Sequence, residues 1–184
     1  MSARLTAIDP QQATGKAKQL LNGVQAKLGM TPNMMRAMAN SPAVLEGYLN
    51  LSGALAHGAL PAKLREKIAL AVGETNGCEY CVSAHTTMGG MIGLQADEIA
   101  AARQSSSADA RQDAALKFVR ALVEKRGEVS DAEVQAVKDA GYTEGEVAEI
   151  IAHVALNLFT NYFNVATQTV VDFPKIALSA KQTA

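Results

Sequence analysis

Apolar side chains recur every three or four residues along most of the chain, which is the spacing of an amphipathic helix. Behind Leu60-Pro61, for example, Leu64, Ile68 and Val72 follow this spacing. The longest such stretch contains Val147, Ile150, Ile151, Val154, Leu156, Leu158, Phe159 and Phe163. No segment alternates apolar and polar residues over the length of a strand. The sequence therefore predicts an all-α fold.

Two capping boxes mark helix starts in the second half of the chain, at Ser130–Glu133 and Thr143–Glu146. Each pairs a hydroxyl side chain with a glutamate three residues later, so that both can satisfy backbone N–H groups of the first turn. The second box opens the longest apolar stretch. We expect this helix to end at Asp172-Phe173-Pro174, because proline cannot continue a helix.

The N-terminal part predicts three further helices. Asp9 followed by Pro10 has the form of a capped start, and Gly29 can end that helix. Thr31-Pro32-Asn33 and Ser41-Pro42 begin the next two. We interpret residues 1–58 as a helical segment packed on a core formed by residues 59–184, in one compact domain, with residues 180–184 frayed.

Composition narrows the function classes. Lys and Arg total 17 and Asp and Glu total 18, so the net charge is -1 and there is no basic surplus for nucleic acid. No apolar run approaches 18 residues, so we expect no membrane span. The N-terminus has no apolar signal core, and a cytoplasmic location is therefore expected.

Both cysteines lie in one short motif that runs from Asn76-Gly77 through Cys78 and Cys81 to His85. In a helix these three side chains share one face over two turns. The Asn-Gly turn places Cys78 at the helix start, where the helix dipole favours a thiolate. The pattern indicates dithiol redox chemistry, with His85 as a base or proton shuttle.

Other uses of a C-x-x-C motif fit less well. A structural zinc site usually has four ligands, and here His57 or His153 would have to complete the set. Haem attachment needs histidine directly after the second cysteine, where this chain has Val82. A thioredoxin motif follows a strand, whereas the preceding segment here is helical. We therefore expect no metal and no bound cofactor.

Adding Glu66, twelve residues before Cys78, gives a pattern that resembles a known family. The pattern is similar to that of the AhpD-like (alkyl hydroperoxidase D) branch of the carboxymuconolactone decarboxylase superfamily. It consists of a glutamate, eleven residues, Cys-x-x-Cys, three residues and a histidine. The flanking segments Leu28–Asn33, Asn157–Asn164 and Asp172–Pro174 resemble its peroxidase-related members. The resemblance extends over roughly residues 9–174.

This resemblance implies an all-α homo-oligomer, typically a trimer or hexamer, with thiol-dependent peroxidase activity toward hydrogen peroxide or organic hydroperoxides. Cys81 would attack the peroxide and Cys78 would resolve it as a disulfide. Glu66 and His85 would form a proton relay. A small dithiol or a protein reductant, of lipoyl or thioredoxin type, would restore the dithiol.

Two alternatives stay open at this point. The same cysteine pair could serve a protein disulfide reductase, a redox adaptor or a redox sensor. The fold could also serve a non-redox decarboxylase or scaffold, although such decarboxylases generally lack the cysteine pair.

Several residues are open as well. By periodicity alone Glu66 is a solvated helix charge, and the helix dipole together with expected exposure favours Cys78 as the more reactive thiol toward large partners. His153 is interpreted as a satisfied core or interface histidine, and Asn161 and Asn164 as residues that bond backbone or line an interface. Tyr80 stands where some relatives carry a histidine.

Overall fold

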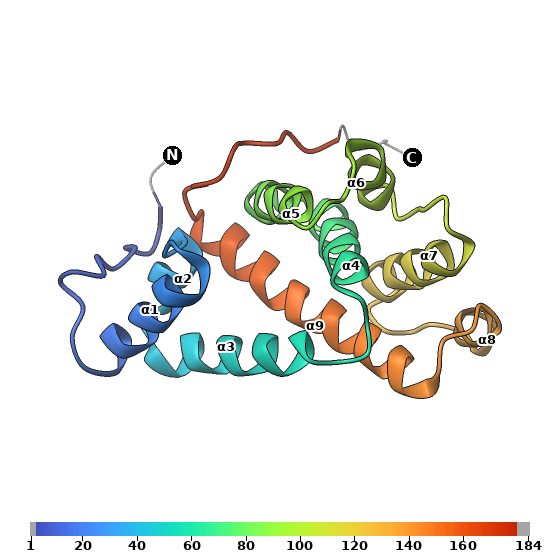
Figure 1. Cartoon of the computed structure of the whole chain (residues 1–184), viewed down its shortest axis with the longest axis horizontal. Helices are drawn as coiled ribbons and strands as arrows, with labels where there is room; N and C mark the ends of the chain where they lie inside the picture. Colours follow the sequence, from blue (N-terminus) through green and yellow to red (C-terminus); the bar gives the residue numbers. More distant parts are fainter. Residues whose placement is uncertain (1–2, 180–184) are drawn as a thin grey trace.

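The computed structural model describes residues 3–179, and within them it contains nine α-helices and no strand (Figure 1). The all-α prediction is confirmed. The helices are α1 (Gly15–Leu28), α2 (Asn33–Met38), α3 (Pro42–Ala56), α4 (Ala62–Thr75), α5 (Glu79–Met91), α6 (Ala96–Arg103), α7 (Ala110–Glu124), α8 (Asp131–Asp139) and α9 (Glu144–Thr167).

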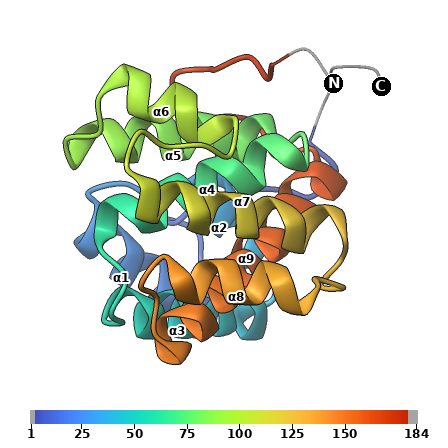
Figure 2. The same ribbon diagram turned by 90° about the vertical axis from the view of Figure 1, so that its right-hand side faces the viewer.

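The long helix α9 runs through the middle of the molecule and borders both halves of it (Figure 1). The helices α1, α2 and α3 lie toward one end, and α6, α7 and α8 toward the other (Figure 2). Helix α4 packs against α5, α6, α7 and α9, so it is buried along most of its length. No helix in the described part of the chain is long and apolar enough to cross a membrane.

A main core fills the space between α4, α7, α8 and α9. Its buried members are Leu60, Leu64, Ile68, Leu70, Ala71, Val72, Ala102, Ala115, Leu116, Phe118, Val119, Leu122, Val137, Tyr142, Val147, Ile150 and Val154. Nearly all are aliphatic, and Leu64, Ile68, Val72, Val147, Ile150 and Val154 come from the helical stripes that the sequence predicts. Burial of such side chains contributes roughly 1.5–3 kcal/mol each before the entropy of ordering is counted.

A second cluster, which we call the sulfur-rich core, joins α1, α2 and α3 to the start of α5. Its buried members are Ala13, Leu21, Val24, Met34, Met35, Met38, Ala39, Leu45, Cys78, Tyr80, Cys81 and Ala84. Methionine is flexible and fills irregular spaces between helices. Both cysteines of the chain lie in this cluster.

Both predicted capping boxes are present, at the starts of α8 and α9. The predicted end of α9 is wrong, because the helix stops at Thr167 and Gln168 adopts a left-handed conformation with φ 50°. Asp172 instead accepts a hydrogen bond of 2.7 Å from the Asn33 backbone N–H, at the start of α2. This contact joins residues 139 positions apart, so the sequence around Asp172 does not indicate it.

The predicted start of the first helix is also wrong. Asp9 accepts hydrogen bonds from the backbone N–H groups of Gln11 and Ala13, which closes a turn rather than a helix. Gly15, the first residue of α1, has φ 55° in the left-handed region that favours glycine, so α1 begins only here.

Residues 169–179 form an extended C-terminal strap that crosses α5 and reaches α6 (Figure 1). The Ile176 N–H donates to Ser83 Oγ at 3.0 Å, and the Ser179 N–H donates to Glu74 Oε1 at 2.6 Å. Arg103 donates to Ala177 O at 2.8 Å. The strap is thus fixed on the helices that carry the motif. The frayed tail expected at residues 180–184 lies outside the described residues.

Candidate active site

The motif helix starts where the sequence predicts. Gly77 adopts φ 67°, and the Cys78 N–H returns a 2.9 Å hydrogen bond to Gly73 O of α4. Cys78 is then the N-cap of α5, and its Sγ accepts a 3.4 Å hydrogen bond from the Cys81 N–H. A sulfur atom therefore takes the position in which a serine or aspartate oxygen usually caps a helix.

The two thiols are reduced and in direct contact. The Cys78 thiol donates to Cys81 Sγ across 2.8 Å. Both residues are buried, with exposed fractions of 1% and 2%. Because a disulfide has sulfur atoms about 2.05 Å apart, the pair needs little rearrangement to become one.

Glu66 and His85 form a pair between α4 and α5. Glu66 Oε2 lies 2.8 Å from His85 Nδ1, and both side chains are 21% exposed. Glu66 is thus turned toward the motif instead of being a solvated charge. Burial alone lowers the pKa of His85, but the Glu66 carboxylate more than offsets this, and the pKa of His85 is raised.

The electrostatics distinguish the two thiols. The hydrogen bond from Cys78 lowers the pKa of Cys81 to about 7 against the effect of burial, with further help from His85. That same hydrogen bond, followed by burial, raises the pKa of Cys78. The order is opposite to the one that helix position favours, and Cys78 is not exposed. Donation between neighbouring thiols outweighs the helix dipole here.

Amide side chains of α9 reach the thiols, which sequence reasoning missed. Asn164 Nδ2 donates to Cys81 Sγ at 3.3 Å and to Met34 Sδ at 3.1 Å. Asn76 Nδ2 donates to Asn161 Oδ1 at 3.0 Å. Both α9 amides help to lower the pKa of Cys81. The available signal was their spacing with Asn157 on one face of an otherwise apolar helix.

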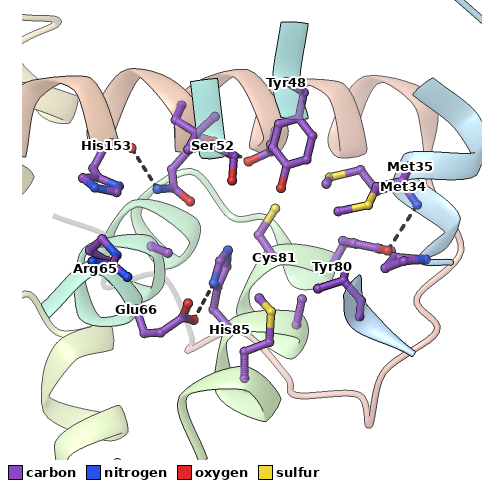
Figure 3. Close-up of a pocket in the computed structure, with 18 of the residues that line it drawn as sticks. Met34, Met35, Tyr48, Ser52, Arg65, Glu66, Tyr80, Cys81, His85 and His153 are labelled. Atoms are coloured by element: carbon purple, nitrogen blue, oxygen red, sulfur yellow. Dashed lines mark hydrogen bonds and ion pairs between the residues drawn. The ribbon is translucent and has the colours of Figure 1, made fainter. Parts of the chain in front are cut away.

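Cys81 forms part of the wall of a cavity of about 240 Å³ between α3, α4, α5 and α9. Figure 3 shows the Tyr48 hydroxyl and the Cys81 thiol pointing toward one another inside it. Burial, followed by the nearby Cys81, raises the pKa of Tyr48 to about 12. Tyr48 is therefore a protonated phenol at neutral pH and can donate a hydrogen bond to a group bound at the thiol.

Cys78 opens instead into a second hollow of about 380 Å³. Its walls are the start of α5, the end of α9 and the first part of the C-terminal strap. The lining residues are Gly77, Cys78, Glu79, Tyr80, Asn164, Val165, Gln168, Thr169, Val170, Val171 and Lys175. The two thiols thus border different spaces.

Tyr80 separates the two spaces and lines both of them. Its hydroxyl accepts a 3.2 Å hydrogen bond from the Met34 N–H. Its ring stands edge-on to Phe173 of the strap, with centroids 5.8 Å apart. Burial, more than any other cause, raises the pKa of Tyr80. The wall between the two spaces is therefore a neutral phenol at neutral pH.

The other two histidines differ from one another. His57 caps the end of α3 on the surface and does not line the cavity. His153 lines the cavity and is 6% exposed, yet its Nε2 has no hydrogen-bond partner among residues 3–179. His153 is thus buried but not satisfied within the described residues, and its prediction as an interface histidine stays a prediction. The described residues contain no cluster of three His, Cys, Asp or Glu side chains that could hold a metal ion.

Comparisons with known proteins bear on this arrangement. Residues 42–125 match the model of the Carboxymuconolactone decarboxylase family, a range that contains Glu66, both cysteines and His85. An uncharacterized protein of Haemophilus influenzae is 53% identical over 45 residues. That match covers 24% of this chain and 40% of the relative, which is less than half of its length.

Solved structures resemble nearly the whole chain. An uncharacterized peroxidase-related protein of Ralstonia eutropha, described as an alkylhydroperoxidase AhpD core, is 25% identical with a TM-score of 0.81, over 92% of each chain. A cysteine-to-alanine variant of the debrominase Bmp8, in complex with 2,3,4-tribromopyrrole, is 22% identical with a TM-score of 0.80. It covers 94% of this chain and 93% of its own.

The family match includes all four residues of the motif, and the fold likeness extends to α1–α3 and α9 on either side of it. A debrominase on the same fold shows that this architecture hosts more than one chemistry. Residues 42–125 thus match the Carboxymuconolactone decarboxylase family, and by motif and by fold the chain is similar to the AhpD-like branch of that superfamily.

Proposed function

We propose that this protein is a thiol-dependent peroxidase that reduces hydrogen peroxide or organic hydroperoxides with the Cys81 thiol. The main support is that Cys81, with a lowered pKa, faces a cavity beside the Glu66–His85 pair. The thiolate is the nucleophilic form of cysteine, and a lowered pKa increases its population at neutral pH. The family's peroxidase-related members support the same activity.

In the first step the Cys81 thiolate attacks the nearer oxygen of the O–O bond. A sulfur–oxygen bond forms, the O–O bond breaks, and the distal oxygen leaves as an alkoxide or hydroxide. His85, whose pKa is raised by the Glu66 carboxylate, supplies the proton that turns this leaving group into an alcohol or water. The neutral hydroxyl of Tyr48 donates a hydrogen bond to the peroxide.

In the second step Cys78 resolves the sulfenic acid on Cys81. The Cys78 sulfur attacks the Cys81 sulfur, a disulfide forms and water leaves, so the enzyme has given two electrons to the peroxide. The thiol contact of 2.8 Å in the reduced state supports this direct route. No loop has to move for the resolving thiol to arrive.

In the third step a dithiol reductant returns the two electrons. The hollow beside Cys78 is separate from the peroxide cavity, so the reductant can reach Cys78 while Cys81 leaves as a thiolate. The lower pKa of Cys81 makes it the better leaving group. A small dithiol of lipoyl type or a protein of thioredoxin type fits this division between the thiols.

We also propose that the protein works as a homo-trimer or homo-hexamer in the cytoplasm. Support for assembly comes from α9, whose outer face exposes apolar side chains at helical spacing. These are Ile151, Phe159, Tyr162 and Val165. A stripe of this kind along the central helix is unusual for a monomer and is suited to contact with another copy.

The proposal is tested by stopped-flow oxidation of the pre-reduced protein with cumene hydroperoxide, with mass spectrometry to follow the Cys78–Cys81 disulfide. We expect one equivalent of peroxide to produce one disulfide, and Cys81→Ser to abolish the reaction. Negligible oxidation by peroxide, together with rapid disulfide exchange with dihydrolipoamide or thioredoxin, would instead identify a disulfide reductase, adaptor or sensor.

A second candidate, thiol-dependent removal of bromine from a ring, is favoured by the likeness to the Bmp8 complex. Two thiols and a carbon–bromine bond would yield a disulfide, a carbon–hydrogen bond and hydrogen bromide. Bromide release from 2,3,4-tribromopyrrole in the same assay tests this candidate. An activity that persists after both cysteines are replaced would identify a non-redox decarboxylase or scaffold.

A further inference from the structure

The cavity beside Cys81 has two unlike ends. Figure 3 shows His153 and Arg65 at one end, Met34 and Met35 at the other, and the Cys81 thiol between them. The methionine end is purely apolar where it meets Leu28 and Phe173. The proposed peroxidase chemistry uses only the middle and gives no role to the polar end.

A purely structural role does not explain the burial of His153. Its Nε2 is buried without a partner in residues 3–179, which is costly unless something else satisfies it. Burial, and then the charge of Arg65, lowers the pKa of His153, so the ring is neutral at neutral pH. A neutral imidazole can present an N–H group into the cavity through Nε2.

Arg65 is the second unused group at this end. Its Nη1 donates to Leu60 O at 2.6 Å, and it forms no ion pair among the described residues. Two carboxylates lie nearby, but each is already engaged. Glu149 accepts hydrogen bonds from the N–H groups of Ala59 and Leu60, and Glu66 is paired with His85. A guanidinium has five N–H donors, so Arg65 retains donors for a ligand.

The cavity size limits what can bind. A cavity of roughly 150 Å³ holds benzene, so about 240 Å³ accommodates a single ring with substituents. Such a ligand can place one group at Cys81 and another at the His153 end. A carboxylate suits that end, because guanidinium and N–H donors recognise its oxygen atoms.

We propose that the preferred peroxide is a ring-sized organic hydroperoxide that carries a carboxylate, which Arg65 and the Nε2–H group of His153 bind. The hydroperoxide group then lies at Cys81, and its apolar part contacts Met34 and Met35. This substrate class rests on the proposed peroxidase function, whereas the carboxylate site itself does not require turnover.

Binding is measured first, without chemistry. The probe is 4-(2-hydroxypropan-2-yl)benzoate, the alcohol that would form from the matching hydroperoxide, and the control ligand is its methyl ester. Calorimetry uses Cys81→Ser protein, in which the cavity is retained. We expect the carboxylate to bind at least about tenfold more tightly than the ester, as one charge-assisted hydrogen bond implies.

Arg65→Met and His153→Leu, each added to this background, should each remove most of the preference for the carboxylate. Arg120→Met is the matched control, because Arg120 is 56% exposed on α7 and lies outside the cavity. Equal affinity for acid and ester in the Cys81→Ser protein overturns the proposal. That comparison needs neither Arg65 nor His153 to be changed, so a folding defect in those variants does not decide it.

Kinetics then separate this inference from the proposed function. The wild-type protein should have a lower KM for 4-(2-hydroperoxypropan-2-yl)benzoate than for cumene hydroperoxide. Arg65→Met should remove that difference, whereas the control Arg120→Met should keep it and leave kcat for cumene hydroperoxide unchanged. Reduction of both peroxides without a carboxylate preference overturns the inference alone. Tight carboxylate binding with no peroxide reduction overturns the peroxidase function and leaves the carboxylate site in place.

Discussion

The main core and the sulfur-rich core are built from the same kind of helix, but their interiors differ. In the main core a buried Lys67 is paired with Glu98 and Gln112, and the Tyr142 ring lies under the Arg111 guanidinium while its hydroxyl is buried without a hydrogen-bond partner within residues 3–179. Beside the sulfur-rich core, Asn164 Oδ1 and His153 Nε2 are buried without a partner within residues 3–179.

This difference shows where the fold tolerates unfavourable groups. A buried polar atom without a partner costs about 1–3 kcal/mol, so a fold built only for stability avoids it. His153 Nε2 lies in the wall of the Cys81 cavity and Asn164 bonds the Cys81 thiol, whereas the main core contains the Tyr142 hydroxyl. Stability is concentrated in one cluster and reactivity in the other, as expected when local rules are broken mainly at functional sites.

The largest effect should come from exchanging the two cysteines for serine. Cys81→Ser should lower the rate of oxidation by cumene hydroperoxide at least about 1000-fold, because the attacking thiolate is gone. Cys78→Ser should still react once and accumulate sulfenic acid, which dimedone traps for mass spectrometry. Trapping that is lost in Cys78→Ser and kept in Cys81→Ser would reverse the roles of the thiols.

In the main core, Leu116→Ala should lower the free energy of unfolding by about 2–5 kcal/mol, because Leu116 is fully buried and its removal leaves a cavity. Urea denaturation measures this loss. The oxidation rate of the folded variant should stay within about twofold of the wild type. A large change in that rate would mean that the two cores are coupled and would contradict their division.

Glu66→Gln should lower the oxidation rate roughly 100-fold, at the low end of what a positioned acid or base contributes. The glutamine can still bond His85, but it no longer favours the imidazolium that is expected to protonate the leaving oxygen. Stopped-flow rates at pH 7 test this. Glu128→Gln, an exposed change that lines neither cavity, is the control and should have no effect.

The smallest effect concerns pH. Because the pKa of Cys81 is lowered to about 7, the oxidation rate should rise with pH through a midpoint near 7, below the ordinary thiol value. Asn164→Ala removes a donor to Cys81 Sγ and should move that midpoint upward. The rate should then fall a few-fold at pH 6 and be unchanged near pH 9, as stopped-flow oxidation across pH can show. An unshifted midpoint would mean that Asn164 does not lower the pKa of Cys81.

The sequence predicts what depends on neighbours along the chain. The helical periodicity, both capping boxes and the turn before Cys78 are local features, and all are present in the structure. Periodicity within one helix does not indicate the pairing of Glu66 with His85, because the pair joins two helices. The resemblance to a family's spacing pattern predicted this pairing, and the 2.8 Å between Glu66 Oε2 and His85 Nδ1 agrees with it.

Long-range contacts explain most of what the sequence did not predict. Asp172 acts on α2 across 139 residues, and Asn164 acts on Cys81 across 83. The Tyr48 hydroxyl points toward the Cys81 thiol (Figure 3), and nothing in the residues around Tyr48 indicates this. Each of these depends on how helices pack, which no pattern within a single helix contains.

Cys78 is both the cap of a helix and one half of a redox couple. Reduction therefore changes the bonding of the atom that holds the first turn of α5. The free energy that the cap contributes to the dithiol can differ from the free energy that it contributes to the disulfide. By thermodynamic linkage, that difference shifts the reduction potential by about 30 mV for each 1.4 kcal/mol. Mutations at the start of α5 thus change the reduction potential of the Cys78–Cys81 pair without replacing either cysteine.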